Sequence, residues 1–395
     1  MPLSTRHARV PYPALQRPLR LALVTEYYYP HLGGICEHVH FFAREARRRG
    51  HHVDIITSRL DDHVSEPGVI RLGRSMPVYA NGSHARFTLG FGLRAALRQH
   101  FVRGAYDLVH VHSPLTPVLP LLAIEEARCP VIGTFHSYCH RSISYRIAGT
   151  YFQDHLDKLA VPIAVSPSTT HALERYFRAD WQVVPNGIDV EMFRPHLPPP
   201  DGVRTDVPVI LFLGRFDPRN GLPLLMEAFR KVRSPRRPAQ LVIVGDGVLR
   251  NRYERLAAGD PDMHFAGAIL NGRPAYYANA SVYACPTDRA SFGITLLEAM
   301  ASGTPVVCSD IEGFRDVVEP NRHALLVKPN DAGALADALV NVLDGDVLRE
   351  RLSVAGRQRA MEFSWPSVTD RVFEVYRAVL QDAPGVVKER SLVPA

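Results

Sequence analysis

Residues 291–307 read SFGITLLEAMASGTPVV and indicate how the chain folds around them. Residues 294–301 have the composition of a short helix, and Gly303 ends it. The β-branched pair Val306-Val307 then begins a strand. A loop–helix–turn–strand unit of this kind leaves free backbone N–H groups at the start of its helix, and those groups favour an anion such as a diphosphate.

Glu298 lies about a turn and a half inside this predicted helix. A carboxylate there can accept hydrogen bonds from sugar hydroxyls, as the acidic residue of dinucleotide-binding folds does. The alternative is an ordinary helix–strand unit in which Glu298 is solvated. This stretch alone does not separate the two.

Length and composition predict a globular protein, with 46% hydrophobic and 22% charged residues. The 395 residues suffice for two domains, each with its own core. No stretch of about 18 uncharged apolar residues occurs, so we expect no membrane-spanning helix. The first 18 residues are basic and lack an apolar segment, which predicts a disordered arm and not a signal peptide. The five cysteines show no C-x-x-C spacing and favour reduced thiols over disulfides or a metal site.

The net charge of +6 is unevenly distributed. Residues 1–200 carry 22 Lys+Arg against 16 Asp+Glu, which accounts for the whole excess. Residues 67–106 contain six arginines and no acid, and residues 127–153 are also free of acid. Such a one-sided field suits an anionic partner such as lipid head groups, nucleic acid or a phosphorylated substrate. The alternative is that arginine simply dominates the basic residues of this chain.

Strand and helix signals alternate along the chain and predict parallel sheets in two α/β domains. In the first half, the expected strands are residues 19–25, 52–57, 108–112, 131–134, 163–165 and 183–184, with a helix at 35–49. Residues 193–208 are rich in proline and lack hydrophobic periodicity, so they mark the boundary. In the second half, the expected strands are 209–213, 240–244, 264–265, 282–285, 306–307 and 324–327, and the expected helices are 222–232, 294–301, 332–343, 347–361 and 368–380.

Two positions in the first half are candidates for ligand binding. Gly33-Gly34 precede a helix and let backbone approach a ligand, although many such loops carry glycines for tight turning alone. His136 follows the strand at 131–134, and the carboxyl ends of the strands form the ligand-binding edge of an open α/β sheet. A lone histidine is otherwise more often structural, but this position favours a function.

Seven motifs occur in the order and spacing of a known enzyme family. From about residue 19 to residue 380 the chain resembles the retaining GT-B glycosyltransferases of the family 4 type. Among them it is most similar in appearance to the phosphatidylinositol mannosyltransferases. The motifs are Gly33-Gly34, LVHVH at 108–112, GTFH at 133–136, VPNGID at 184–189, LGRF at 213–216, VGDG at 244–247 and the segment 292–307.

This resemblance implies an α/β protein of GT-B fold, in which two Rossmann-like parallel-sheet domains face a central cleft. It implies that the second domain binds a nucleotide-sugar donor and that the first binds the acceptor. Catalytic roles fall on His136, which would face the transferred sugar, and on Arg215, which would hold the diphosphate. The implied donor-binding residues are Gly33, Gly34, Arg215, Asn220, Gly245, Ser291, Phe292, Gly293, Ile294 and Glu298.

Two positions depart from the family pattern. Asn220 stands where the family usually has a lysine, and Ala290 stands where the first glutamate of an E-x7-E motif belongs. Loss of one charge-assisted contact is worth roughly 1.5–3 kcal/mol. The sequence therefore permits a slow or donor-shifted enzyme, or an inactive relative, while the remaining motifs favour an active transferase.

Residues 82–101 resemble the part of phosphatidylinositol mannosyltransferases that binds membrane. Leu93, Leu97 and Phe101 fall on one side of a predicted helix, with basic residues beside them. Such a helix can lie among lipid head groups; the alternative is an ordinary surface helix packed on its sheet. The residues predicted to serve the acceptor or the membrane are Arg86, Arg94, Arg98, Tyr138 and Arg141.

The leading hypothesis is a retaining glycosyltransferase that moves a hexose, with mannose from GDP-mannose as first choice, onto a lipid-linked or inositol-containing acceptor. The alternatives are a UDP-sugar-dependent transferase with a soluble acceptor, or a weakened binding or regulatory relative, given Ala290 and Asn220. The expected partners are the nucleotide-sugar, a lipid or polyol acceptor and an anionic membrane surface. Nucleic acid is not expected, because aromatic platforms interleaved with arginine are lacking.

We expect a cytoplasmic protein, with the inner face of the membrane as its peripheral binding surface, and no cofactor or required metal. The predicted domain organisation has five segments. These are a basic arm (1–18), an acceptor-binding domain (19–195), a linker (196–207), a nucleotide-sugar-binding domain (208–365) and a C-terminal helix and tail that cross back to the first domain (366–395).

Overall fold

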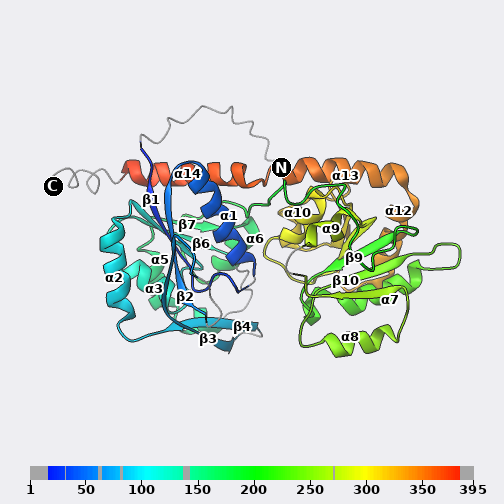
Figure 1. Cartoon of the computed structure of the whole chain (residues 1–395), viewed down its shortest axis with the longest axis horizontal. Helices are drawn as coiled ribbons and strands as arrows, with labels where there is room; N and C mark the ends of the chain where they lie inside the picture. The colour runs from blue at the N-terminus through cyan, green and yellow to red at the C-terminus, as the bar shows by residue number, and fades with distance from the viewer. Residues whose placement is uncertain are drawn as a thin grey trace.

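The computed structural model describes residues 17–31, 33–60, 65–80, 83–136, 143–269 and 272–382. Within these residues the chain forms two α/β halves that lie side by side, each built around one sheet (Figure 1). The predicted fold class is therefore confirmed.

The first half consists of residues before the proline-rich boundary. Its strands are β1 (Arg20–Val24), β2 (His52–Arg59), β3 (Val69–Ala80), β4 (Ser83–Leu89), β5 (Leu108–His112), β6 (Val131–Phe135), β7 (Val161–Ala164) and β8 (Gln182–Val183). Its helices are α1 (Gly34–Arg48), α2 (Leu93–Gly104), α3 (Leu119–Glu126), α4 (Ile143–Ile147), α5 (Gly149–Leu156) and α6 (Pro167–Leu173). The strand order is β4-β3-β2-β1-β5-β6-β7-β8, with parallel pairing except between β3 and β4.

The second half is an all-parallel sheet covered by helices. Its strands are β9 (Val209–Leu213), β10 (Gln240–Val244), β11 (Met263–Gly267), β12 (Val282–Cys285), β13 (Val306–Ser309) and β14 (Leu325–Val327). Its helices are α7 (Leu222–Val232), α8 (Arg250–Ala257), α9 (Arg273–Ala278), α10 (Ile294–Ala301), α11 (Glu312–Arg315), α12 (Ala332–Asp344) and α13 (Asp346–Met361), with a 3-10 helix at Pro218–Asn220. The strand order is β11-β10-β9-β12-β13-β14.

The strand orders explain where a ligand can bind. In the first sheet β1 lies between β2 and β5, and in the second β9 lies between β10 and β12, so the direction of winding reverses at β1 and at β9. Open α/β sheets bind ligands in the crevice outside the carboxyl ends of their strands at such reversal points. The segments that follow β1, β6, β9, β10 and β12 hold the candidate site residues.

The last helix, α14 (Trp365–Asp382), packs on the first half although it follows the second half in sequence (Figure 1). Its buried side chains Trp365, Phe373 and Tyr376 belong to the same core cluster as Phe42 of α1. The isolated bridge between Ile188 and Ser364 brings this crossing beside the boundary between the halves. The two halves are thus connected where the chain returns from the second half to the first, at the start of α14.

One part of the first half differs from the sequence prediction. Residues 69–89 form the antiparallel pair β3 and β4, where the sequence analysis assigned no strand. Both strands carry arginines on an edge of the sheet, so the alternation of apolar and polar residues that reveals a strand is weak there.

Candidate active site

A cavity of about 260 Å³ lies between the two halves. The first half contributes the start of α1 and the end of β6, and the second half contributes the loop before α10 together with α10 itself. Of the predicted site residues, the cavity brings together Gly34, His136, Ser291, Phe292, Gly293, Ile294 and Glu298. Sequence segments more than 250 residues apart therefore meet where the resemblance expects the cleft.

The loop before α10 joins the two halves. Ser291 Oγ donates to the carbonyl oxygen of His136 at 3.2 Å, and Ser166 Oγ donates to the carbonyl oxygen of Ser291 at 2.8 Å. Gly293 caps α10 with a φ of 110°, which residues with side chains rarely adopt. A Cβ there would lie 3.0 Å from Phe314 Cδ1, so both backbone and packing demand glycine.

Glu298 is buried inside α10, with 1% of its surface exposed. The hydroxyl of Tyr277 donates to Glu298 Oε2 at 2.8 Å. Burial raises the pKa of Glu298 to about 7, although the charge of Arg273 opposes this rise. The alternative of a solvated Glu298 is therefore wrong. The carboxylate lines the cavity and has lone pairs to spare for further donors.

Arg273 bridges the two halves and was missed by the sequence analysis. Its guanidinium lies at the start of α9, 2.8 Å from Glu37 Oε1 of α1 and 3.4 Å from Glu298 Oε1. The two carboxylates raise the pKa of Arg273, so this residue stays charged. A single basic residue at the start of a short helix carries no sequence signal for such a contact, because its partners lie 236 positions earlier and 25 positions later.

Arg215, Asn220 and Gly245 follow strands of the second sheet and lie outside the lining of this cavity. The side-chain amide of Asn220 donates to the carbonyl oxygen of Arg215 at 2.7 Å, so Asn220 shapes the loop that carries Arg215. Gly245 has a φ of 146°, and a Cβ there would lie 2.0 Å from the carbonyl oxygen of Gly214. Packing alone therefore requires glycine at position 245, whether or not this residue contacts a ligand.

Arg86 and Arg215 approach the same residue from opposite halves. Burial lowers the pKa of His31, and the positive charges of Arg86 and Arg215 lower it further. Arg86 is held on β4 by Ser75, whose Oγ accepts from Arg86 Nε at 2.7 Å. Arg86 of the first half and Arg215 of the second therefore both bring positive charge near His31, a field suited to an anion.

Gly33 and Gly34 stand before and at the start of α1. Gly33 is extended, with a φ of 168°, so its backbone does not require glycine. Within the described residues, a Cβ built on either glycine would meet no atom within 4 Å, apart from their chain neighbours. Local packing therefore gives no reason for these glycines, and the space beside them is open to a ligand.

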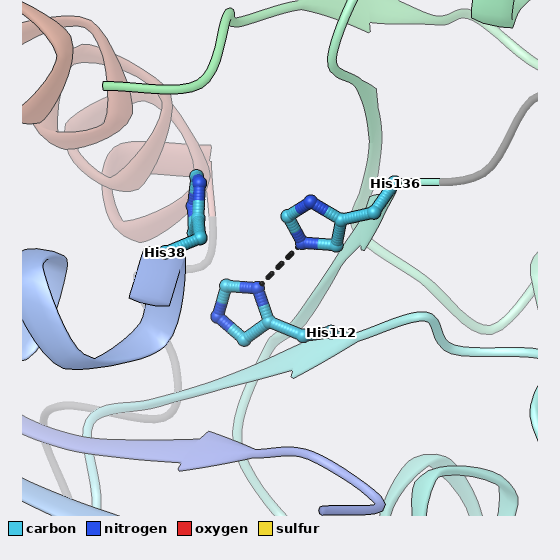
Figure 2. Close-up of side chains that lie close together, drawn as sticks. All are labelled: His38, His112 and His136. Carbon is cyan, nitrogen blue, oxygen red and sulfur yellow. Dashed lines mark hydrogen bonds between the residues drawn. The ribbon is translucent and has the colours of Figure 1, made fainter. Parts of the chain in front are cut away.

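Three buried histidines from separate elements lie together beside the cavity (Figure 2). His38 lies on α1, His112 ends β5 and His136 follows β6, and one nitrogen of each lies within 4.8 Å of the others. Burial lowers the pKa of His38 to about 4 and those of His112 and His136 well below the ordinary value, so all three are neutral at pH 7.

This arrangement corrects one sequence inference. No metal site was expected from the sequence, but the fold brings three possible metal ligands together from distant segments. Three neutral imidazoles are chemically able to hold a transition metal. The absence of a required metal remains a prediction.

The predicted membrane helix is α2, and its apolar side packs inward. Leu93, Leu97 and Phe101 are buried in the core of the first half. Arg94 and Arg98 form ion pairs with Glu126 of α3, with N–O distances of 2.6 Å. This is the alternative of an ordinary surface helix packed on its sheet. Arg94 also pairs with Glu125, so acids outside the acid-free run compensate part of its charge.

Two remaining predicted residues, Tyr138 and Arg141, lie outside the described residues. Within the described residues, no helix is both long and apolar enough to cross a membrane.

Comparison with known families matches both halves of the chain. The model described as Glycosyltransferase Family 4 matches residues 32–192, and the model described as Glycosyl transferases group 1 matches residues 207–345. The two matches meet at the proline-rich boundary.

Related proteins agree with these matches over most of the chain. A phosphatidyl-myo-inositol mannosyltransferase of Mycobacterium tuberculosis is 34% identical over 372 residues, covering 91% of this chain and 97% of the relative. Sucrose-phosphate synthase of Thermosynechococcus elongatus has the same fold, with a TM-score of 0.73 and 24% identity over 92% of this chain and 99% of the other. HepE of Anabaena, solved with UDP and glucose, gives a TM-score of 0.72 at 20% identity over 91% of this chain and 100% of the other. The chain thus belongs to glycosyltransferase family 4 and is a glycosyltransferase of GT-B fold.

Proposed function

We propose that this glycosyltransferase moves mannose from GDP-mannose onto the inositol ring of a phosphatidylinositol-type lipid, with retention of anomeric configuration. The observation that carries the proposal is the 34% identity to a phosphatidyl-myo-inositol mannosyltransferase across 97% of that relative's length. The geometry supports it, because both halves contribute residues to one cavity, as a two-substrate transfer requires.

Glu298 is assigned to the ribose of the nucleotide. Its carboxylate lines the cavity and already accepts one hydrogen bond from Tyr277, which fixes its direction. A carboxylate has about four lone-pair positions, so the two ribose hydroxyls can bind without displacing Tyr277.

The diphosphate is assigned to the space between Arg215 and the start of α1. Arg215 supplies charge, and Gly33 and Gly34 leave room beside the backbone. His136, whose side chain lines the cavity, would face the sugar to be transferred. Asn220 cannot replace the charge of a lysine, but it holds the Arg215 loop in place, which favours an active enzyme over an inactive relative.

The proposed reaction is a displacement at the anomeric carbon. The bond from that carbon to the diphosphate breaks, the acceptor hydroxyl oxygen bonds to the carbon on the same face, and the hydroxyl proton passes to the departing diphosphate. The protein contributes positioning and stabilisation of the leaving-group charge.

A lipid acceptor implies contact with a membrane surface, which we place at the cytoplasmic face. Arg94 and Arg98 contribute less to this contact than their number suggests, because Glu125 and Glu126 already pair with them. Arg86, whose side chain donates to Ser75 and forms no ion pair with an acid of the described residues, is the better candidate for an anionic acceptor.

Nucleotide binding tests the donor assignment. The free energy of unfolding is measured with GDP, UDP, GDP-mannose and UDP-glucose in turn. A ligand at 100 times its Kd stabilises the fold by about 2.7 kcal/mol. We expect a shift with GDP and GDP-mannose that is lost in Glu298→Gln.

The matched control is Glu254→Gln, which removes a carboxylate that pairs with Arg250 on the surface of α8. This variant should keep the full ligand-induced shift. A shift with the uridine nucleotides alone would contradict the GDP-mannose assignment, and no shift with any nucleotide would contradict the donor site.

A further inference from the structure

His112 lies behind His136 and contacts it directly. His112 Nδ1 and His136 Nε2 are 3.1 Å apart and share a hydrogen bond (Figure 2). Both side chains are neutral at pH 7 because burial lowers their pKa values. A neutral imidazole carries one proton, so one ring donates in this bond and the other accepts.

The other nitrogen of His112 decides which ring donates. His112 Nε2 is buried and has no hydrogen-bond partner among the described residues. If His112 accepted at Nδ1, its proton would sit on Nε2 as a buried N–H without a partner. If His112 donates from Nδ1, Nε2 carries only a lone pair. Buried donors without partners are rarer and more costly than buried acceptors without partners, so His112 is the donor.

This choice determines the proton position on His136. Its Nε2 accepts from His112, so its single proton lies on Nδ1. Asn186 lines the same cavity, and its Oδ1 lies 3.0 Å from His38 Nδ1.

The ring of His112 is held rigidly. It stacks on His110 with ring centroids 4.4 Å apart and an interplanar angle of 26°. His110 is fixed at both nitrogens, by Tyr376 Oη of α14 at 2.7 Å and by Thr134 Oγ1 at 2.7 Å. The crossing helix therefore helps to hold the imidazole that orients His136.

We propose that His112 is a positioning residue that holds His136 as its Nδ1–H tautomer, so that His136 presents a hydrogen-bond donor to the bound sugar. That His136 faces the sugar rests on the proposed function, whereas the assignment of its tautomer does not depend on that function. In this arrangement His136 cannot remove a proton from the acceptor, because its free ring nitrogen already carries one. It serves by orienting a sugar oxygen in the cavity.

The test is nitrogen-15 NMR of the full chain labelled at histidine, with the His136 signals assigned by comparison with His136→Gln. Protonated and bare imidazole nitrogens resonate in separate regions of the spectrum. We expect Nδ1 of His136 to be protonated and Nε2 to be bare at pH 7. A protonated Nε2 would overturn the proposal, whether or not the enzyme uses GDP-mannose.

Two variants of His112 separate positioning from packing. In His112→Asn the amide N–H stands near the position of Nδ1 and can still donate, whereas His112→Leu fills the space without a donor. We expect the His136 signature to persist in the Asn variant and to become a mixture of tautomers in the Leu variant. With loss of one hydrogen bond, kcat of the Leu variant should fall roughly tenfold, with KM for the donor unchanged.

An unchanged His136 spectrum and an unchanged kcat in His112→Leu would each overturn the proposal. The purified protein could also contain one equivalent of zinc bound through His38, His112 and His136, and this result would overturn the proposal too. A metal bound by all three rings needs lone pairs on ring nitrogens that the proposal assigns to the proton between His112 and His136.

Discussion

Replacement of Glu298 by glutamine should remove a pH-dependent cost to stability. Burial raises the pKa of Glu298 from its ordinary value of 4.5 to about 7. A folded-state pKa above the unfolded value means that the folded protein holds the proton more tightly. The resulting stability is fully present below pH 4.5 and is lost as the pH rises through about 7. At 1.36 kcal/mol per pKa unit, the loss is about 3 kcal/mol.

The assay is urea denaturation of both proteins at pH 5, 6, 7 and 8. Glutamine does not titrate, so the stability of Glu298→Gln relative to the unmodified chain should rise by up to about 3 kcal/mol over this interval. Glu26, whose pKa burial raises to about 8, titrates in both proteins and cancels in the comparison. A difference that does not change with pH, or that falls as pH rises, would refute the assigned environment of Glu298.

Four further substitutions test the packing of Gly245 and of helix α2. Leu97→Ala should lower the free energy of unfolding, measured by urea denaturation, by about 2–5 kcal/mol, because Leu97 is fully buried on the inward side of α2 and its truncation leaves a cavity. Retention of full stability would show that this helix does not pack on its sheet. Gly245→Ala should lower the free energy of unfolding, measured by thermal denaturation, by about 2 kcal/mol or more, because the new Cβ would lie 2.0 Å from the carbonyl oxygen of Gly214. Gly259→Ala, at a left-handed φ of 70° but with open space around it among the described residues, should cost clearly less. Arg94→Gln should leave Tm unchanged within error, because its guanidinium is about half exposed and exposed ion pairs add little.

The strands and helices of the second half followed closely from the sequence. The structure places β9, β12, α7 and α10 at the residues predicted for them. These elements are buried on both faces or strongly amphipathic, so the hydrophobic pattern alone specifies them. The motif at 291–307 could be predicted as a loop, helix and strand for the same reason.

The environment of Glu298 could not be predicted in this way. The sequence indicated that a carboxylate follows an anion-binding turn, and the structure shows that Tyr277 and Arg273 surround it. Neither partner belongs to a motif, because each contact is made by a single side chain on a neighbouring helix. Contacts of this kind depend on how helices pack and not on local periodicity.

The histidine cluster shows the same limit. His136 was predicted as a site residue from its position at the end of β6, and it does line the cavity. His112 was part of a motif, but nothing in the sequence indicated that its ring meets those of His38 and His136. Only the parallel pairing of β5 with β6, and the placement of α1 above them, brings these rings together.

The basic first half was the least predictable part. An arginine-rich stretch without acids suggested an exposed positive surface, but acids from α3 pair with Arg94 and Arg98. Charge counted along a sequence window cannot reveal partners that arrive from another helix.

The most direct test of the proposed function is transfer of labelled mannose from GDP-mannose to phosphatidylinositol in mixed anionic vesicles. The account predicts a mannosylated inositol lipid whose anomeric carbon keeps the α configuration of the donor, with the rate strongly reduced in Glu298→Gln and unchanged in Glu254→Gln. Transfer from UDP-glucose in preference to GDP-mannose, a product of inverted configuration, or no lipid product from a protein that binds GDP would contradict it.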